Sequence, residues 1–111
     1  MLSRKNRISK KEFPSPKAKG ARFFSTSFST TIYTGKDKTL FSIVVSKKIS
    51  KKAVDRNHLK RQFYSLAEKH LKTIIKGVKI VIYPKKEALK TPFLLLQKEL
   101  STVLKTAKLI P

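Results

Sequence analysis

A long amphipathic helix followed by a short apolar strand restricts the fold of this chain more than any other feature of its sequence. Between about Lys51 or Ala53 and Ile75, four side chains recur at offsets of four, three and four, the period of a helix with one buried face: Leu59, Phe63, Leu66 and His70. Gly77 is expected to end this helix. Residues 78–83 then form a nearly all-apolar strand, typical of the centre of a sheet. Because residues 39–46 predict another strand before the helix, the order indicates a parallel pair joined by a crossover.

The strand at residues 39–46 is expected to have a neighbour that precedes it in the sequence. Residues 24–33 alternate between two faces, and one face carries Phe24, Phe28 and Ile32. A turn over residues 34–38 separates the two segments. We therefore expect them to form an antiparallel hairpin.

The two ends of the chain predict shorter elements. A last helix is expected to begin at Thr91-Pro92, with Thr91 as its N-cap and Pro92 in its first turn. A short helix is expected near residues 9–13, with Ser9 as its cap, inside a basic segment over residues 1–22 that could equally be a flexible arm. The 111 residues thus predict one domain.

The charge of the chain points to an anionic partner. The formal net charge is +21, while 40% of the residues are apolar, enough for a globular core. So large a charge repels itself in a compact state unless a partner neutralises it. Nucleic acid is the expected partner, and an anionic membrane surface is the second alternative. No segment is long and apolar enough for a membrane span, and there is no cysteine, so we expect a soluble cytoplasmic protein with no disulfide or Cys-type zinc site.

The acidic residues and histidines predict no catalytic centre in the protein itself. The six acids are dispersed, with no pair spaced for acid–base chemistry or for metal binding. His70 is read as a helix residue bordering the core. His58 lies beside a basic cluster and is as consistent with a solvated side chain as with a phosphate contact.

The basic cluster has an order that charge alone does not require. At about 100° per residue, Arg56, Asn57, Lys60 and Arg61 fall within a sector of roughly 140° on the helix, next to the apolar face. Arginine forks bind phosphate with two hydrogen bonds, lysine acts as a point charge, and an asparagine can donate to phosphate or sugar. An ordinary solvated basic face is the alternative.

This stretch resembles the bacterial ribonuclease P protein subunit. The resemblance rests on Val44-Val45-Ser46-Lys47-Lys48, followed by Ala53-Val54-Asp55-Arg56-Asn57-His58-Leu59-Lys60-Arg61, and weaker similarity extends over nearly the whole chain. It implies an α/β (α+β) two-layer sandwich, with a central mixed β-sheet, a left-handed βαβ crossover and a long basic helix.

The same resemblance implies the function and the partners. A large RNA subunit would carry the active site and its Mg²⁺ ions, and the protein would assist it in removing the 5′ leader of precursor tRNA, as one monomer per RNA. The residues implied to bind the RNA subunit are Lys47, Lys48, Lys51, Lys52, Arg56, Asn57, His58, Lys60 and Arg61. Those implied to bind the leader, in a cleft between the sheet and the N-terminal helix, are Phe13, Lys17 and Phe28.

Several positions depart from the family pattern. His58 replaces the usual second arginine of the motif, and Tyr64 and Ser65 replace a further arginine and an acid. Lys17 and Thr31 stand where Phe and Tyr are common, and the connection Ile49-Ser50-Lys51-Lys52 is one residue longer than in many members. Two alternatives stay open: a small basic ribosomal-type structural RNA-binding protein, and a metal-dependent nuclease that acts alone.

Overall fold

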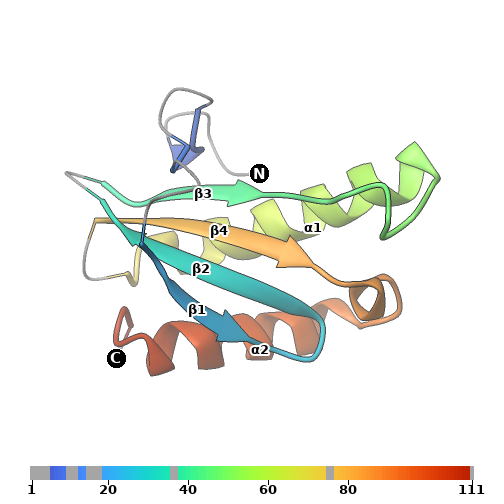
Figure 1. Ribbon diagram of the computed structural model, residues 1–111. Helices are drawn as coiled ribbons and strands as arrows, with labels where there is room; N and C mark the ends of the chain where they lie inside the picture. Colours follow the sequence, from blue (N-terminus) through green and yellow to red (C-terminus); the bar gives the residue numbers. More distant parts are fainter. Residues whose placement is uncertain (1–5, 10–12, 15–18, 36–37, 75–76, 111) are drawn as a thin grey trace.

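The computed structural model describes residues 6–9, 13–14, 19–35, 38–74 and 77–110. Their helices and strands are β1 (Ala21–Phe24), β2 (Phe28–Thr34), β3 (Leu40–Ile43), α1 (Ala53–Leu71), β4 (Val78–Pro84), the short 3₁₀ helix η2 (Lys86–Leu89) and α2 (Phe93–Thr106). The sheet order is β1-β2-β4-β3, and both long helices lie on one face of it (Figure 1). The predicted two-layer α+β architecture is therefore confirmed.

The crossover between β3 and β4 is parallel and left-handed. Phe41 pairs with Ile80 and Ile43 with Ile82 in a parallel register. In Figure 1 both strands run to the right, with β3 above β4 and α1 behind them, and this arrangement defines a left-handed connection. Such crossovers are rare, because strand twist favours the right-handed form.

The expected hairpin between residues 24–33 and 39–46 is wrong. Strand β4 lies between β2 and β3, antiparallel to the first and parallel to the second. The physical reason is the composition of β4: Ile80, Val81 and Ile82 are all fully buried, so this strand takes the centre of the sheet, with a partner on each edge.

The predicted strand over residues 24–33 is in fact two strands. The chain turns at residues 25–27, where the Ser25 N–H donates to the Phe28 carbonyl over 2.9 Å. The antiparallel hairpin that does form is β1–β2, with Phe24 opposite Ser29. The turn is tied to α2, because the Glu99 carboxylate accepts from the Ser27 N–H at 2.9 Å and from the Ser27 hydroxyl at 2.8 Å.

The core lies between the sheet and the two helices. Phe28 of β2 meets Phe63 of α1 edge to face, with ring centroids 5.4 Å apart. Around this pair lie fully or almost fully buried side chains from both helices: Leu59, Leu66, Leu96, Leu100 and Leu104. His70 also lies at this helix interface, with its ring nitrogens 3.0 Å from the Leu66 carbonyl and 2.8 Å from the Ser101 hydroxyl. Its predicted structural place is thereby confirmed.

Two predicted helix ends differ from the structure. Helix α1 ends at Leu71 instead of Ile75, because both the N–H and the hydroxyl of Thr73 donate to the His70 carbonyl and close the last turn. Thr91 does not cap α2: its hydroxyl donates to the Glu87 carbonyl, and α2 follows Pro92 without a side-chain cap. The helix expected near residues 9–13 falls largely outside the described residues.

The described part of the N-terminal segment runs beside the outer edge of β3. The Ile8 N–H donates to the Phe41 carbonyl over 2.8 Å, and the Arg7 guanidinium lies 4.5 Å from the centre of the Tyr64 ring. Tyr64, one of the departures from the family pattern, thus holds this segment by a cation–π contact. None of the helices in the described ranges is both long and apolar enough to span a membrane.

Candidate nucleic-acid interface

The first half of α1 divides into a buried face and a cationic face, as its spacing predicts. Leu59 and Phe63 are buried, while Asn57, Lys60 and Arg61 are exposed. His58 is exposed as well. The helix can therefore pack against the sheet and offer donors to a polyanion at the same time.

The connection that leads into α1 adds four more cations. Lys47, Lys48, Lys51 and Lys52 are all exposed, and Ile49 between them packs against the core. We call residues 46–52 the basic loop. The loop and the start of α1 are consecutive in the chain, and eight of the nine predicted RNA-binding residues are exposed, all except Arg56.

Arg56 differs from the other members of that stretch. Its side chain is half-buried, and its Nη1 donates to the Ser50 carbonyl over 2.8 Å. At least one of its donors is therefore used inside the protein. The sequence could not show this, because the contact depends on how the basic loop folds back on the helix.

The predicted leader-binding residues lie in different environments. Phe28 is fully buried and packs on Phe63, so it presents no ring face to a ligand; its placement in the leader cleft is corrected to a core position. Phe13 is 41% exposed and stays available for contact. Lys17 lies outside the described residues.

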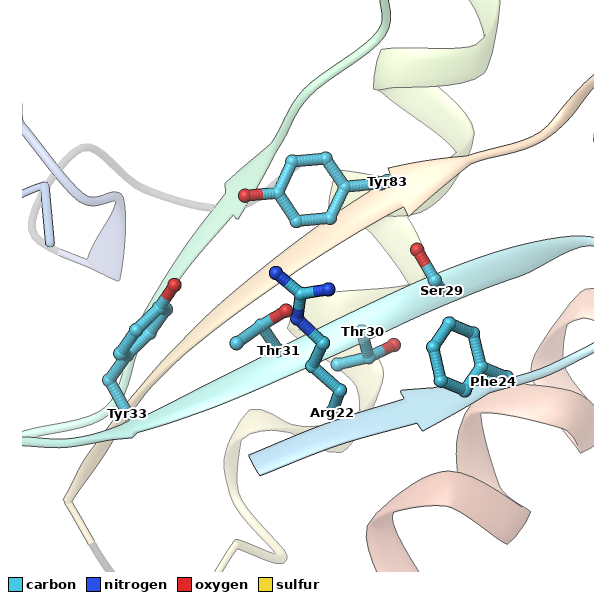
Figure 2. A pocket seen from close by; sticks show the side chains of 7 residues that line it. All are labelled: Arg22, Phe24, Ser29, Thr30, Thr31, Tyr33 and Tyr83. Atoms are coloured by element: carbon cyan, nitrogen blue, oxygen red, sulfur yellow. The ribbon is translucent and has the colours of Figure 1, made fainter. Parts of the chain in front are cut away.

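A hollow on the sheet face away from the helices offers a different set of side chains. It has a volume of about 210 Å³ and is lined by Arg22, Phe24, Ser29, Thr30, Thr31, Tyr33 and Tyr83. Figure 2 shows the Arg22 side chain of β1 reaching across β2 toward Tyr83 of β4, with Tyr33 at the other end of the hollow. This volume is below the roughly 300–1,000 Å³ of typical small-molecule pockets, so the hollow suits a single planar group.

The chemistry of the hollow comes from two phenols and one guanidinium. Burial raises the pKa of the Tyr83 phenol, the nearby Tyr33 raises it further, and Arg22 opposes both effects. Tyr83 therefore keeps its proton and can donate a hydrogen bond at neutral pH. Arg22 can bind a phosphate or stack on a ring.

The position of Tyr33 depends on a close approach of the backbone. A Cβ atom at Gly20 would lie 2.7 Å from Thr31 Cγ2 and 2.8 Å from Tyr33 Cε1. Because real contacts of this kind are longer, a side chain at residue 20 would displace the Tyr33 ring. Gly20 thus lets the chain enter β1 directly beside the hollow.

Sequence reasoning missed this hollow as a site. One signal was present: Ser29, Thr31 and Tyr33 alternate with the buried face of β2. However, Arg22 and Tyr83 join them only through the register, in which Arg22 faces Thr31 and Tyr83 faces Ser29.

The described residues contain no group of three or more His, Asp or Glu side chains that could hold a metal ion. The Glu99 carboxylate accepts hydrogen bonds from the N–H and the hydroxyl of Ser27, so it has a structural place. The described surface offers cations, amide groups and aromatic rings, all of which can bind a nucleic acid.

Comparison with known proteins agrees with this geometry. Residues 2–108 match the family model described as Ribonuclease P. A protein from Pseudanabaena called ribonuclease P protein component is 35% identical over 113 aligned residues, which cover 99% of this chain and 97% of the relative.

Solved structures show the same fold. The RNase P protein of Staphylococcus aureus has a TM-score of 0.72 and 28% identity, over 83% of this chain and 84% of the other. The RNase P protein of Thermotoga maritima has a TM-score of 0.70 and 28% identity, over 78% and 83%.

Proposed function

Because this chain belongs to the ribonuclease P family and is a protein component of that enzyme, partnering the RNase P RNA, we propose that two of its surfaces bind different RNA segments. The basic loop and the start of α1 bind the RNA subunit. The hollow on the open sheet face binds the 5′ leader of precursor tRNA. The RNA subunit carries out the cleavage.

The exposed cations of the first surface support the RNA-binding role. This surface has six exposed lysine and arginine side chains, and each can neutralise a phosphate. They lie at positions 47, 48, 51, 52, 60 and 61. Asn57 is exposed among them and adds a donor that is directional but carries no charge. The positive charges provide affinity, while the directional hydrogen bonds of Asn57 and Arg61 fix the position of the protein on the RNA.

The hollow supports the leader-binding role. A leader is single-stranded, so its bases are free to stack on aromatic rings without being read by sequence. Tyr33 and Tyr83 offer such rings, and Arg22 lies between them to meet a phosphate or a base edge. Phe13 remains a second candidate, and Lys17 remains a proposal from the family resemblance.

We place the magnesium ions on the RNA subunit. The described acids of the protein form no metal-binding group, whereas precursor tRNA and RNA subunit repel each other through their phosphates. A protein of net charge +21 can screen that repulsion, so it should lower the magnesium concentration at which the RNA cleaves. The same charge disfavours self-association, which supports one protein per RNA.

The open face is the observation that carries the leader assignment, and a comparison of two ligands tests it. Holoenzymes with Tyr33→Ala or Arg22→Ala should bind precursor tRNA about 1–3 kcal/mol more weakly, the range for loss of one stacked base. They should bind mature tRNA, which has no leader, as the wild type does.

Lys98→Ala is the matched control, because it removes one exposed cation from α2 on the other face of the sheet. Equal losses for precursor and mature tRNA would refute the assignment of the hollow. A loss with Lys98→Ala as large as with Arg22→Ala would show that only total charge matters.

A further inference from the structure

The basic loop is anchored by a small polar cluster at the start of α1. Ser50 is its centre: the Ser50 carbonyl accepts from Arg56 Nη1 at 2.8 Å, and the Ser50 hydroxyl donates to Asp55 Oδ2 at 3.1 Å. The same hydroxyl accepts from the Lys52 N–H at 3.2 Å. We call Ser50, Asp55 and Arg56 the loop clamp.

The clamp adds side-chain contacts to a loop whose other restraints are backbone hydrogen bonds, from the Ile49 N–H to the Ser46 carbonyl and from the Arg56 N–H to the Lys52 carbonyl, and the packing of Ile49 against the core. Lys51 and Lys52 are exposed, and Lys52 precedes α1 without a side-chain cap. A lysine on an unrestrained loop is a point charge without a fixed position, and ordering it on binding RNA costs conformational entropy. Holding the backbone in place before binding reduces that cost.

We infer that Asp55 and Arg56 are positioning residues: they hold the basic loop against α1, so that Lys51 and Lys52 meet the RNA subunit together with Asn57, Lys60 and Arg61. This inference rests on the proposed function. It gives the only acid between residues 47 and 61 a role in binding a polyanion. It also assigns Arg56 a part within the protein, through Ser50.

Replacing Asp55 gives a test in which two explanations predict opposite changes in the affinity for RNA. If Asp55 acts only through its charge, its removal makes the surface more positive and RNA binding tighter. If it acts through the clamp, Asp55→Ala loosens the loop and binding becomes weaker although the net charge rises. We expect about three- to tenfold weaker binding, the fold-change of one ordinary hydrogen bond.

The experiment measures the Kd of the full-length protein for RNase P RNA across a salt series. Asp55→Ala and Ser50→Ala should each weaken binding and reduce the slope of log K against log salt by about one, as expected for one lost phosphate contact. The double variant should bind RNA no more weakly than the single variant with the larger loss, because both substitutions remove the same Ser50–Asp55 hydrogen bond. Asp55→Asn keeps an acceptor for Ser50 and should bind more tightly than Asp55→Ala.

Controls separate failure of the clamp from failure of the binding surface. Glu87→Gln makes the same charge change on η2 and should not weaken binding, and unchanged thermal unfolding of each variant shows that the fold is intact. Binding by Asp55→Ala as tight as wild type or tighter would overturn the clamp. If the double variant Lys60→Ala with Arg61→Ala also kept full affinity, the proposed RNA surface itself would be refuted.

Discussion

Replacing Phe28 with alanine should test whether this ring belongs to the core or to the leader site. The side chain is fully buried and packs edge to face on Phe63. Truncating a buried Phe to Ala removes apolar contact and leaves a cavity, which typically costs 3–5 kcal/mol. A domain of this size has a free energy of unfolding of roughly 5–15 kcal/mol, so the loss is a large fraction of the total.

The expected shift of the melting temperature follows from chain length. With about 2.1 cal/mol/K of unfolding entropy per residue, 111 residues give about 0.23 kcal/mol/K. A loss of 3–5 kcal/mol then lowers Tm by roughly 13–21 °C. Urea unfolding followed by circular dichroism measures the same loss as a shift of the midpoint, with the m-value unchanged.

Two companion variants sharpen this test. Phe28→Leu keeps most of the volume and should cost less than about 1.5 kcal/mol. A double-mutant cycle with Phe63→Leu should give a coupling energy of about 0.5–1.5 kcal/mol for the aromatic pair. A Phe28→Ala protein with near-normal stability but weakened binding of precursor tRNA alone would refute the core placement.

Two further predictions concern charge. Replacing Lys60 and Arg61 with Ala should weaken binding of RNase P RNA and reduce the slope of log K against log salt by about two. Replacing Lys86 and Lys90 with Ala should weaken binding much less. Equal losses of affinity in a binding assay across a salt series would mean that the charge acts diffusely. Tyr83→Phe should resist alkaline unfolding better than wild type. The folded pKa of Tyr83 is raised above the usual tyrosine value of 10.0, so its contribution to stability is present below pH 10.0 and is lost as pH rises through the folded pKa. Urea unfolding at about pH 9 and about pH 11 checks this, and a stability difference that is the same at both values contradicts it.

The strongest periodic signals predicted their elements well. The helix could be predicted because Leu59, Phe63 and Leu66 repeat at helical spacing. Strand β4 could be predicted because it is a short, nearly all-apolar run. The parallel crossover followed from their order. The left-handed connection came from the family resemblance alone, since general rules favour the opposite hand.

The order of the strands and the leader site could not be predicted in the same way. Neighbours in sequence usually pair, yet β4 separates β2 from β3, and only the packed sheet shows it. The turn at residues 25–27 has no Gly, Pro, Asn or Asp, and is stabilised by Glu99 from the distant α2. The hollow with Arg22 and Tyr83 depends on the resulting register, so its residues share no local pattern.

The central place of β4 also decides when this protein can fold during its synthesis. Strands β2 and β3 each need β4 as a neighbour, and β4 is made about 45 and 35 residues after them, respectively. The nascent chain therefore leaves the ribosome with the β1–β2 hairpin, the lone strand β3 and the whole basic stretch before the central strand β4 exists. Partners so distant in sequence also slow the search for the native pairing. We expect the newly made chain to meet cellular RNA while it is still unfolded, so that RNA can act on its folding as well as on its function.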